Sequence, residues 1–266
     1  MTTAGTIRTG IGGWTFEPWR GTFYPDTLKQ KDELNFASRQ LKVIEVNGTY
    51  YSTQKPESFR RWAAETPDDF VFSVKASRFT TNRRVLAEAG ESIERFIGSG
   101  LGELKHKLGP VLWQFAPTKK FEPEDFGTFL ELLPKTLDGK PLRHAIEVRH
   151  ESFIVPAFAA LARQYSVAIV FADSEKYPMI GDVTGDFVYA RLQNAKEDIA
   201  TGYSAPAIKK WAERASVWAE GGDAKDLAHA AKSAAPKKQR DVFVYMINGA
   251  KVRAPAAARA LLAKLK

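Results

Sequence analysis

The chain of 266 residues has no cysteine, only four histidines and only three methionines. Without cysteine there can be no disulfide, zinc thiolate site or cysteine nucleophile. Four histidines are also too few for a barrel nuclease site built around several zinc ions, because such a site needs several histidine ligands. The missing cysteines agree with a reducing compartment, and we expect the protein to be cytoplasmic.

Long apolar runs are also missing. No stretch approaches the roughly 18 apolar residues that mark a membrane-spanning helix, and residues 1–10 lack the apolar centre of a signal peptide. We therefore expect a soluble protein with no membrane partner.

Two sequence signatures are absent as well. There is no GxSxG, which argues against a Ser-His-Asp hydrolase of that type. Glycines 10, 12 and 13 are followed by Trp14 and Pro18 rather than by a helix start, so the phosphate-binding fingerprint of a dinucleotide fold is not formed. We expect no cofactor.

What is present is ordinary globular composition, with 44% hydrophobic and 26% charged residues. The net charge of +8 is unevenly distributed, because residues 237–266 contain eight basic residues and one acidic residue. A basic protein invites a nucleic-acid interpretation. Here, however, the excess charge lies at one end of the chain.

Eight short runs rich in β-branched and aromatic residues recur along the chain, separated by segments with helical periodicity. The runs are 7–13, 43–47, 70–76, 111–116, 144–150, 168–174, 187–193 and 242–249. The helical segments include 58–65, 91–109, 124–137, 153–166 and 205–221. This alternation predicts an α/β fold, a (β/α)8 TIM-type barrel of parallel strands in a single domain, 1–266. An open doubly wound sheet is the alternative.

One connection is unusually long. About fifty residues separate the last two runs, and after the predicted helix 205–221 the segment 222–240 is rich in alanine and lysine. We expect an exposed or flexible insertion between strands 7 and 8.

Polar residues lie at the ends of most predicted strands, where a barrel carries its active site. Glu45 and Asn47 are two residues apart and share a face of their strand, as do Glu147 and Arg149. Because their neighbours are branched aliphatic residues, we expect the polar side chains to point into the barrel. The other strand-end residues are Lys75, Gln114, Asp173, Arg191 and Asn248.

These charges have two interpretations. They can form an ion-paired layer with no ligand, since buried charges need partners. We favour a ligand site, because barrel interiors are normally aliphatic. Glu45, Glu147, Asp173 and Lys75 are then the candidate catalytic groups. A two-carboxylate glycosidase stays open, whereas a Mg²⁺ or Mn²⁺ site is disfavoured because Lys75, Arg149 and Arg191 would compete for the carboxylates.

The stretch IGGWTFEPWRGTFYP at 11–25 follows the first predicted strand and contains five aromatic residues. It is either an apolar plug or a stacking surface at the barrel mouth. We expect Trp14 and Tyr24 to form a wall of the pocket, Arg20 to point its polar end toward the mouth, and Trp19 to support them.

Several motifs together resemble one known family. GIGGWTFEPWRGTFYP, VIEVNGTYYSTQKPESFRRWAAETPDDFVFSVKASRFTT, LGPVLWQFAP, IEVRHESF, FADS and FVYARLQ are similar, in order, to the YecE-like family, domain of unknown function 72. The resemblance implies a TIM-barrel fold and brings no established reaction. The family's motif positions here are Trp14, Trp19, Arg20, Tyr24, Glu45, Asn47, Tyr50, Lys75, Gln114, Glu147, Arg149, His150, Asp173 and Arg191.

The chain departs from this family pattern in two places. Arg191-Leu192-Gln193-Asn194 stands where members usually have an R-L-H-G-like motif. Met246-Ile247-Asn248 stands where they usually have an F-N-N-like motif. Chemistry that used the missing histidine as an acid or base is not expected here.

Three functions remain open from the sequence. The first is a metal-independent enzyme or binder for an anionic, phosphate-containing or sugar-like small molecule at the barrel mouth. The second is a nucleic-acid-binding or -processing protein in which Trp14, Trp19 and Tyr50 stack bases and the basic loops follow the backbone. The third is a ligand-binding module without catalysis. The sequence gives no oligomeric state.

Overall fold

The structure is a computed structural model that describes residues 4–265; the predicted domain 1–266 also includes residues 1–3 and 266, which lie outside the described residues. Within that range, nine strands form one sheet whose neighbouring strands are all parallel. They are β1 (Ile7–Gly12), β2 (Val43–Val46), β3 (Val71–Lys75), β4 (Leu108–Gln114), β7 (His144–Glu147), β8 (Ala168–Ile169), β9 (Phe171–Asp173), β10 (Phe187–Leu192) and β11 (Asp241–Met246).

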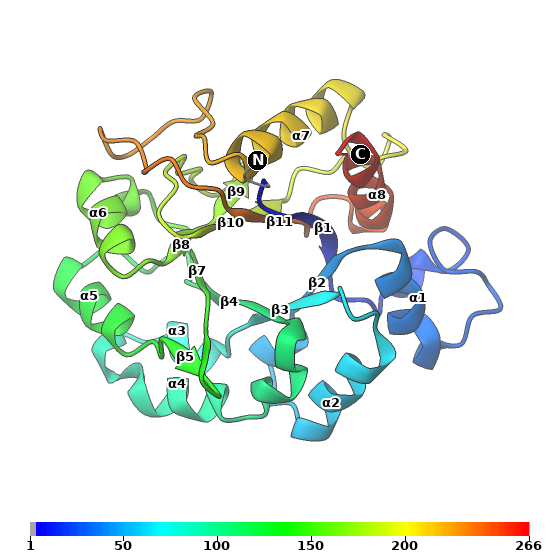
Figure 1. The fold of residues 1–266 in the computed structure, drawn as a ribbon, viewed down its shortest axis with the longest axis horizontal. Coiled ribbons are helices and arrows are strands. Elements are labelled where there is room, and N and C mark those ends of the chain that lie inside the picture. Colours follow the sequence, from blue (N-terminus) through cyan, green and yellow to red (C-terminus); the bar gives the residue numbers. More distant parts are fainter. Residues whose placement is uncertain (1–3, 266) are drawn as a thin grey trace.

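The sheet closes into a barrel (Figure 1). β8 and β9 stand at the two ends of the strand order, yet they are consecutive in the chain and separated by Val170 alone. β8 pairs with β7 and β9 pairs with β10, and the Val170 N–H donates to the Ile146 carbonyl at 2.9 Å. The nine strands thus correspond to the eight predicted runs, and the (β/α)8 prediction is confirmed.

Helices surround the barrel (Figure 1). The α-helices are α1 (Glu33–Gln40), α2 (Pro56–Glu65), α3 (Arg78–Thr81), α4 (Gly90–Ile97), α5 (Pro123–Glu131), α6 (Pro156–Gln164), α7 (Ala205–Ala219) and α8 (Ala254–Lys264). Proline occupies the first or second position of α2, α5, α6, α7 and α8, where it needs no hydrogen-bond partner. None of the described helices is long and apolar enough to span a bilayer.

Some elements differ from the prediction. The predicted helix 91–109 is divided into α4 and a 3₁₀ segment at Leu101–Lys107, because Gly100 between them has φ +116°, a conformation that favours glycine. Helix α1 and a small hairpin of β5 (Thr136–Leu137) and β6 (Lys140–Pro141) were not predicted. Both are short. The predicted helix 124–137 is wrong at its end, because α5 stops at Glu131 and Thr136–Leu137 forms β5.

Alternation along the strands divides the core into two layers. Ile44 and Val46 of β2 belong to the larger apolar cluster, which includes the helices, whereas Val43 belongs to a second cluster made of strand residues. β7 repeats the pattern, with Ile146 in the larger cluster and Ala145 in the second. The odd-numbered residues of these two strands therefore point into the barrel, as the period of two predicted for Glu45 and Glu147.

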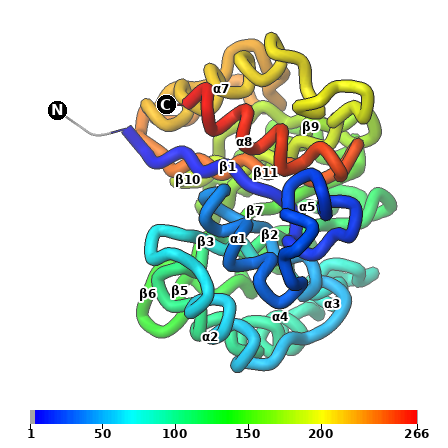
Figure 2. The backbone as a smooth tube through the Cα atoms, turned by 90° about the vertical axis from the view of Figure 1, so that its right-hand side faces the viewer, coloured from blue at the N-terminus to red at the C-terminus, as the bar shows by residue number. Residues whose placement is uncertain are grey.

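The two ends of the chain meet in the barrel wall. β1 pairs with β11, and Figure 2 shows α8 running alongside both. Gly10 permits the close pairing of β1 with β2, because a Cβ at this position would lie 1.7 Å from the Val43 carbonyl oxygen.

The segment 222–240 has turns but no helix or strand among its residues, all of which are described. It passes from α7 toward α6 and is tied down at its centre. The buried Asp182 carboxylate accepts the N–H groups of Ala230 at 2.6 Å and Ala231 at 3.2 Å, and Arg163 of α6 donates to the Ser233 hydroxyl at 3.0 Å.

Candidate functional site

A cavity of about 620 Å³ opens where the carboxyl ends of β1, β2, β3, β4, β10 and β11 meet. This is the end of a barrel that carries active sites. Its lining comprises Gly12, Gly13, Trp14, Thr15, Val46, Asn47, Gly48, Tyr51, Gln54, Trp62, Lys75, Gln114, Arg149, Arg191, Ile247, Asn248 and Lys251. The structure thus brings together seven of the predicted site residues: Trp14, Asn47, Lys75, Gln114, Arg149, Arg191 and Asn248.

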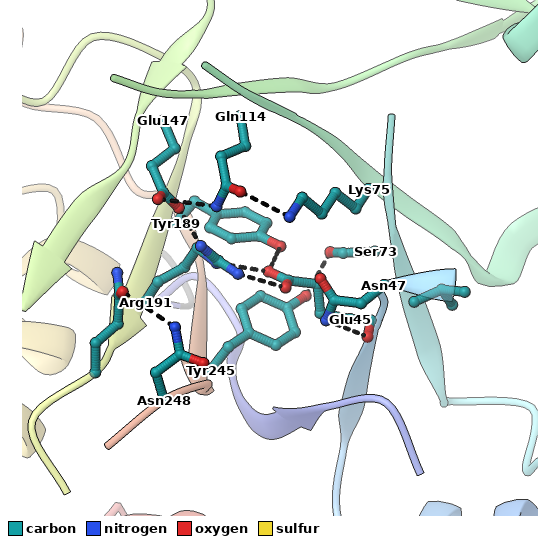
Figure 3. Close-up of polar contacts among 12 residues, drawn as sticks. Glu45, Asn47, Ser73, Lys75, Gln114, Glu147, Tyr189, Arg191, Tyr245 and Asn248 are labelled. Carbon is teal, nitrogen blue, oxygen red and sulfur yellow. Dashed lines mark hydrogen bonds and ion pairs between the residues drawn. The ribbon is translucent and has the colours of Figure 1, made fainter. Parts of the chain in front are cut away.

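Arg191 forms the centre of the cavity floor and is 2% exposed. Its guanidinium grips the Glu45 carboxylate with two hydrogen bonds, Nε to Oε2 at 3.0 Å and Nη2 to Oε1 at 2.9 Å (Figure 3). Its Nη1 donates to Glu147. The Tyr189 hydroxyl donates a further hydrogen bond to Glu45 at 2.7 Å. Although burial lowers the pKa of Arg191, Glu147 and Glu45 raise it overall, so the guanidinium stays charged.

Glu147 is held by three donors. Besides Arg191, its Oε1 accepts from Arg149 Nε at 2.7 Å and from Gln114 Nε2 at 3.0 Å. Burial raises the pKa of Glu147, but the charges of Arg191 and Arg149 outweigh it and leave the pKa below its usual value. Glu45 and Glu147 are both completely buried and do not line the cavity. The two carboxylates lie behind the guanidinium groups of Arg149 and Arg191, which line the cavity.

Lys75 reaches the cavity from β3 and is 7% exposed. Its Nζ donates to Gln114 Oε1 at 2.7 Å and lies 4.0 Å from the centre of the Tyr50 ring (Figure 3 shows the Gln114 contact). Burial, with a smaller contribution from the positive charge of Arg191, lowers the pKa of Lys75 to about 8. Lys75 therefore loses its proton much more readily than an exposed lysine.

The apolar side of the cavity is aromatic. Trp14 packs edge-on against Trp62 of α2, with ring centres 5.1 Å apart, and Tyr51 lies on the same lining. Trp62, Tyr51, Gln54, Thr15 and Lys251 line the cavity but were not predicted as site residues. Trp62 has the helical spacing of a core residue, and it is also packed in the core, so its sequence pattern does not reveal a second role.

Arg20 and Tyr24 do not line the cavity, contrary to prediction. Tyr24 is buried, and its hydroxyl donates to the Trp14 carbonyl at 2.6 Å. Arg20 pairs with Glu33 at 2.7 Å. Trp19, predicted as a support, is buried and donates from Nε1 to the Lys251 carbonyl at 2.9 Å. Tyr24 and Trp19 thus brace two cavity-lining residues from behind.

Asp173, His150 and Tyr50 also lie outside the lining. Asp173 accepts from the Asn194 amide at 3.0 Å and the Tyr203 hydroxyl at 3.1 Å, and burial raises its pKa. His150 Nδ1 accepts from the Ser152 N–H at 3.1 Å and caps the turn that follows β7. Tyr50 lies behind Lys75 as its aromatic contact.

Within residues 4–265, no group of three or more His, Asp or Glu side chains is placed to hold one metal ion. The lining of the cavity over these residues has four basic side chains, Lys75, Arg149, Arg191 and Lys251, and no acidic one. The polar groups of this lining are therefore mainly N–H donors and amides, which suit oxygen acceptors and anions.

Together these features define a (β/α)8 barrel with a basic cavity at the carboxyl ends of its strands. Residues 8–266 match the family model described as "Protein of unknown function DUF72", and the chain belongs to that family.

Curated relatives include the UPF0759 proteins YunF of Bacillus subtilis and YecE of Escherichia coli K12. The chain is 26% identical to YunF over 157 residues, which are 57% of this chain and 54% of that protein. It is 28% identical to YecE over 119 residues, which are 44% of this chain and 41% of that protein. The chain therefore matches about half the length of these relatives.

Solved structures of the family share the fold. A DUF72 family protein from Thermotoga maritima matches with a TM-score of 0.71 and 23% identity, covering 97% of both chains. One from Enterococcus faecalis matches with a TM-score of 0.68 and 17% identity, again over 97% of both. At these identities the likeness establishes the barrel fold alone.

Proposed function

We propose that the cavity binds a small anionic ligand, a carboxylate or phosphate. One observation carries this proposal: of the residues described, those that line the cavity include four basic side chains and no acidic one. A concave basic site concentrates anions because its low-dielectric walls strengthen each charge.

Two of these cations are available to a ligand. Lys75 contacts an amide and an aromatic ring, and Lys251 Nζ lies 4.6 Å from the centre of the Phe16 ring. An ammonium has three N–H donors, and the hydrogen bond to Gln114 uses one of those on Lys75. Arg149 directs its Nε to Glu147 and its Nη1 to the Tyr177 hydroxyl at 3.4 Å, which fixes the guanidinium at the cavity edge.

Lys75 is the group we assign to proton transfer, if the bound ligand reacts. It lines the cavity, and its pKa of about 8 is close to the pH at which an acid or base works best. Glu45 and Glu147, the carboxylates first considered for this role, have the role of positioning residues in this proposal, since every contact that they make holds a guanidinium, an amide or a tyrosine hydroxyl.

The aromatic side gives the ligand a second recognition element. Trp14 and Trp62 present apolar ring surface opposite polar groups. Such pairing suits a ligand with one flat or weakly polar face, including a sugar ring, as well as an anionic group.

A nucleic-acid function has less support. The basic residues Arg83, Arg84, Lys119 and Lys120 line a separate hollow of about 590 Å³. Arg83 already donates to the Phe79 carbonyl and to Ser92, and Lys119 donates to the Arg84 carbonyl at 2.7 Å. These two cations hold the loops together, which leaves few free charges to follow a phosphate backbone.

The test is titration of sulfate and inorganic phosphate into the purified protein by isothermal calorimetry. Lys75→Met should weaken both affinities about tenfold or more, since a charge-assisted hydrogen bond is lost. Lys140→Met, an exposed lysine on β6, is the matched control and should leave them unchanged. Equal affinities in the wild type and Lys75→Met, or no binding by the wild type, would overturn the proposal.

A further inference from the structure

A second pocket adjoins the cavity described above. It has a volume of about 410 Å³ and shares the residue Asn248 with the cavity. Arg149, which lines the cavity, lies over the ring of Tyr177, which lines the second pocket, with 4.2 Å from the guanidinium carbon to the ring centre. The two spaces are therefore neighbours: Asn248 lines both, and Arg149 of one lining stacks on Tyr177 of the other.

Gln193 lines the second pocket and carries a buried donor without a partner. The residue is 8% exposed, and its Oε1 accepts from Asn248 Nδ2 at 3.4 Å (Asn248 is labelled in Figure 3). Its Nε2 makes no hydrogen bond to any described residue. A buried N–H without an acceptor destabilises the folded protein, and a bound molecule that supplies the acceptor would remove this cost.

The other groups of the pocket are mostly uncharged hydrogen-bonding groups. Ser174, Tyr177 and Asn194 contribute hydroxyl and amide groups. Of its three charged residues, Lys196 pairs with Glu175 at 3.2 Å, and all three, Lys176 included, are exposed. Amide and hydroxyl groups of this kind recognise hydroxyl or carbonyl oxygens rather than a strong charge.

We propose that this pocket is a subsite for the hydroxyl-bearing part of the same ligand whose anionic group enters the basic cavity. The inference rests on the anion site proposed above and names its substrate class: a hydroxylated organic anion, such as a sugar acid or a sugar phosphate. Gln193 Nε2 donates to a ligand oxygen and thereby selects hydroxylated anions over plain ones.

The spacing of Arg191 in β10 and Gln193, one residue beyond the end of β10 at Leu192, fits a ligand of this size. Arg191 and Gln193 are two residues apart on one extended segment, so their α-carbons are about 7 Å apart. A six-carbon chain or ring bearing an anionic group spans a similar length. In this proposal one molecule contacts Arg191 at the cavity floor and the Gln193 amide by passing Asn248, which lines both spaces.

The experiment compares four probes by calorimetry: acetate and inorganic phosphate as plain anions, and gluconate and glucose 6-phosphate as their hydroxylated partners. The wild type should bind each hydroxylated probe more tightly than its plain partner. Gln193→Met should weaken the hydroxylated probes about five- to tenfold, the value of one hydrogen bond, and leave the plain anions unchanged. Lys75→Met should weaken all four. Gluconate against glucose 6-phosphate distinguishes a carboxylate from a phosphate ligand.

Two controls accompany these variants. Gln164→Met, an exposed glutamine at the end of α6, should change nothing. Gln193→Asn keeps the amide but shortens the side chain by one methylene, so it should reproduce the selective loss even if Gln193→Met does not fold.

The outcomes separate the two proposals. If plain anions bind but the hydroxylated probes gain no affinity, or if Gln193 variants weaken all four probes equally, the subsite is wrong and the anion site stands. If none of the probes binds the wild type, the anion site is wrong and the subsite falls with it.

Discussion

At the scale of single residues, the pKa values of the two central buried cations shift in opposite directions, although burial alone lowers both. Lys75 has an amide and an aromatic ring as partners, so burial lowers its pKa to about 8. Arg191 is buried more deeply than Lys75, but it pairs with the carboxylates of Glu45 and Glu147, and their negative charges raise its pKa. One cation is therefore fixed in its charged state, whereas the other can change its charge near neutral pH.

The pH dependence of anion binding tests the state of Lys75. Protonated Lys75 attracts an anion and neutral Lys75 does not, so sulfate affinity should fall as the pH rises through about 8. Between pH 7 and 9 we expect the affinity to decrease by up to roughly tenfold, because most Lys75 side chains lose their proton over this range. Calorimetry with sulfate is suitable, since its charge is constant over this range.

Lys75→Met supplies the contrast for that measurement. The variant should retain only the weaker dependence from Lys251, whose pKa burial also lowers. A wild-type affinity that is constant from pH 7 to 9, or an equal decrease in the variant, would show that Lys75 does not contact the anion.

At the scale of elements, the ion pairs of Arg191 join three strands across the barrel. Arg191 comes from β10, Glu45 from β2 and Glu147 from β7. The loop after β1 has a comparable bracing role, because Tyr24 holds Trp14 and Trp19 holds the backbone at Lys251. The positions of the cavity-lining side chains thus depend on contacts between elements that are distant in sequence.

Removal of Arg191 measures this linkage. Arg191→Met leaves Glu45 and Glu147 buried without their main counter-charge, and we expect the free energy of unfolding to fall by about 3–5 kcal/mol. Urea unfolding followed by circular dichroism gives the value. Arg95→Met, which removes an exposed ion pair with Glu91, is the control and should have little effect. Similar losses in both variants would mean that the buried network contributes no more than a surface pair.

At the scale of the whole molecule, one long connection joins β10 to β11 and includes α7 and the segment 222–240. The segment 222–240 is held near its ends by Asp226, which pairs with Arg214, and by Arg240, which donates to the Gly185 carbonyl. At its centre the buried Asp182 carboxylate holds the N–H groups of Ala230 and Ala231. The four lysines of the segment, Lys225, Lys232, Lys237 and Lys238, are exposed, and the last three follow this central contact in the sequence. We propose that Asp182 limits the mobility expected of this insertion from its composition.

Limited trypsin digestion tests the anchor. Asp182→Ala should accelerate cleavage after Lys232, Lys237 and Lys238 about tenfold, as read by mass spectrometry, because local opening becomes easier. Asp125→Ala is the matched control, since Asp125 accepts two backbone N–H groups of another loop, at Leu86 and Ala87. If both variants, or neither, accelerate cleavage in 222–240, Asp182 is not the anchor.

The sequence by itself determined the barrel and the polar strand ends. A period of two places Glu45 and Glu147 opposite their aliphatic neighbours, and eight β-rich runs alternating with helices leave few other arrangements. Lys75, Gln114 and Arg191 were predicted from their positions at strand ends and Arg149 from its period of two with Glu147. The structure places these four on one cavity.

Only the tertiary structure decided which of these groups line the cavity. Strand parity gives the face of a side chain but not its depth or its partners, so it could not show that Arg191 covers both carboxylates. Nor could it show that Tyr24 turns to the Trp14 backbone, or that Trp62 from α2 joins the lining. The same holds for the unpartnered amide of Gln193. Each of these depends on contacts between distant segments, which form only when the barrel closes.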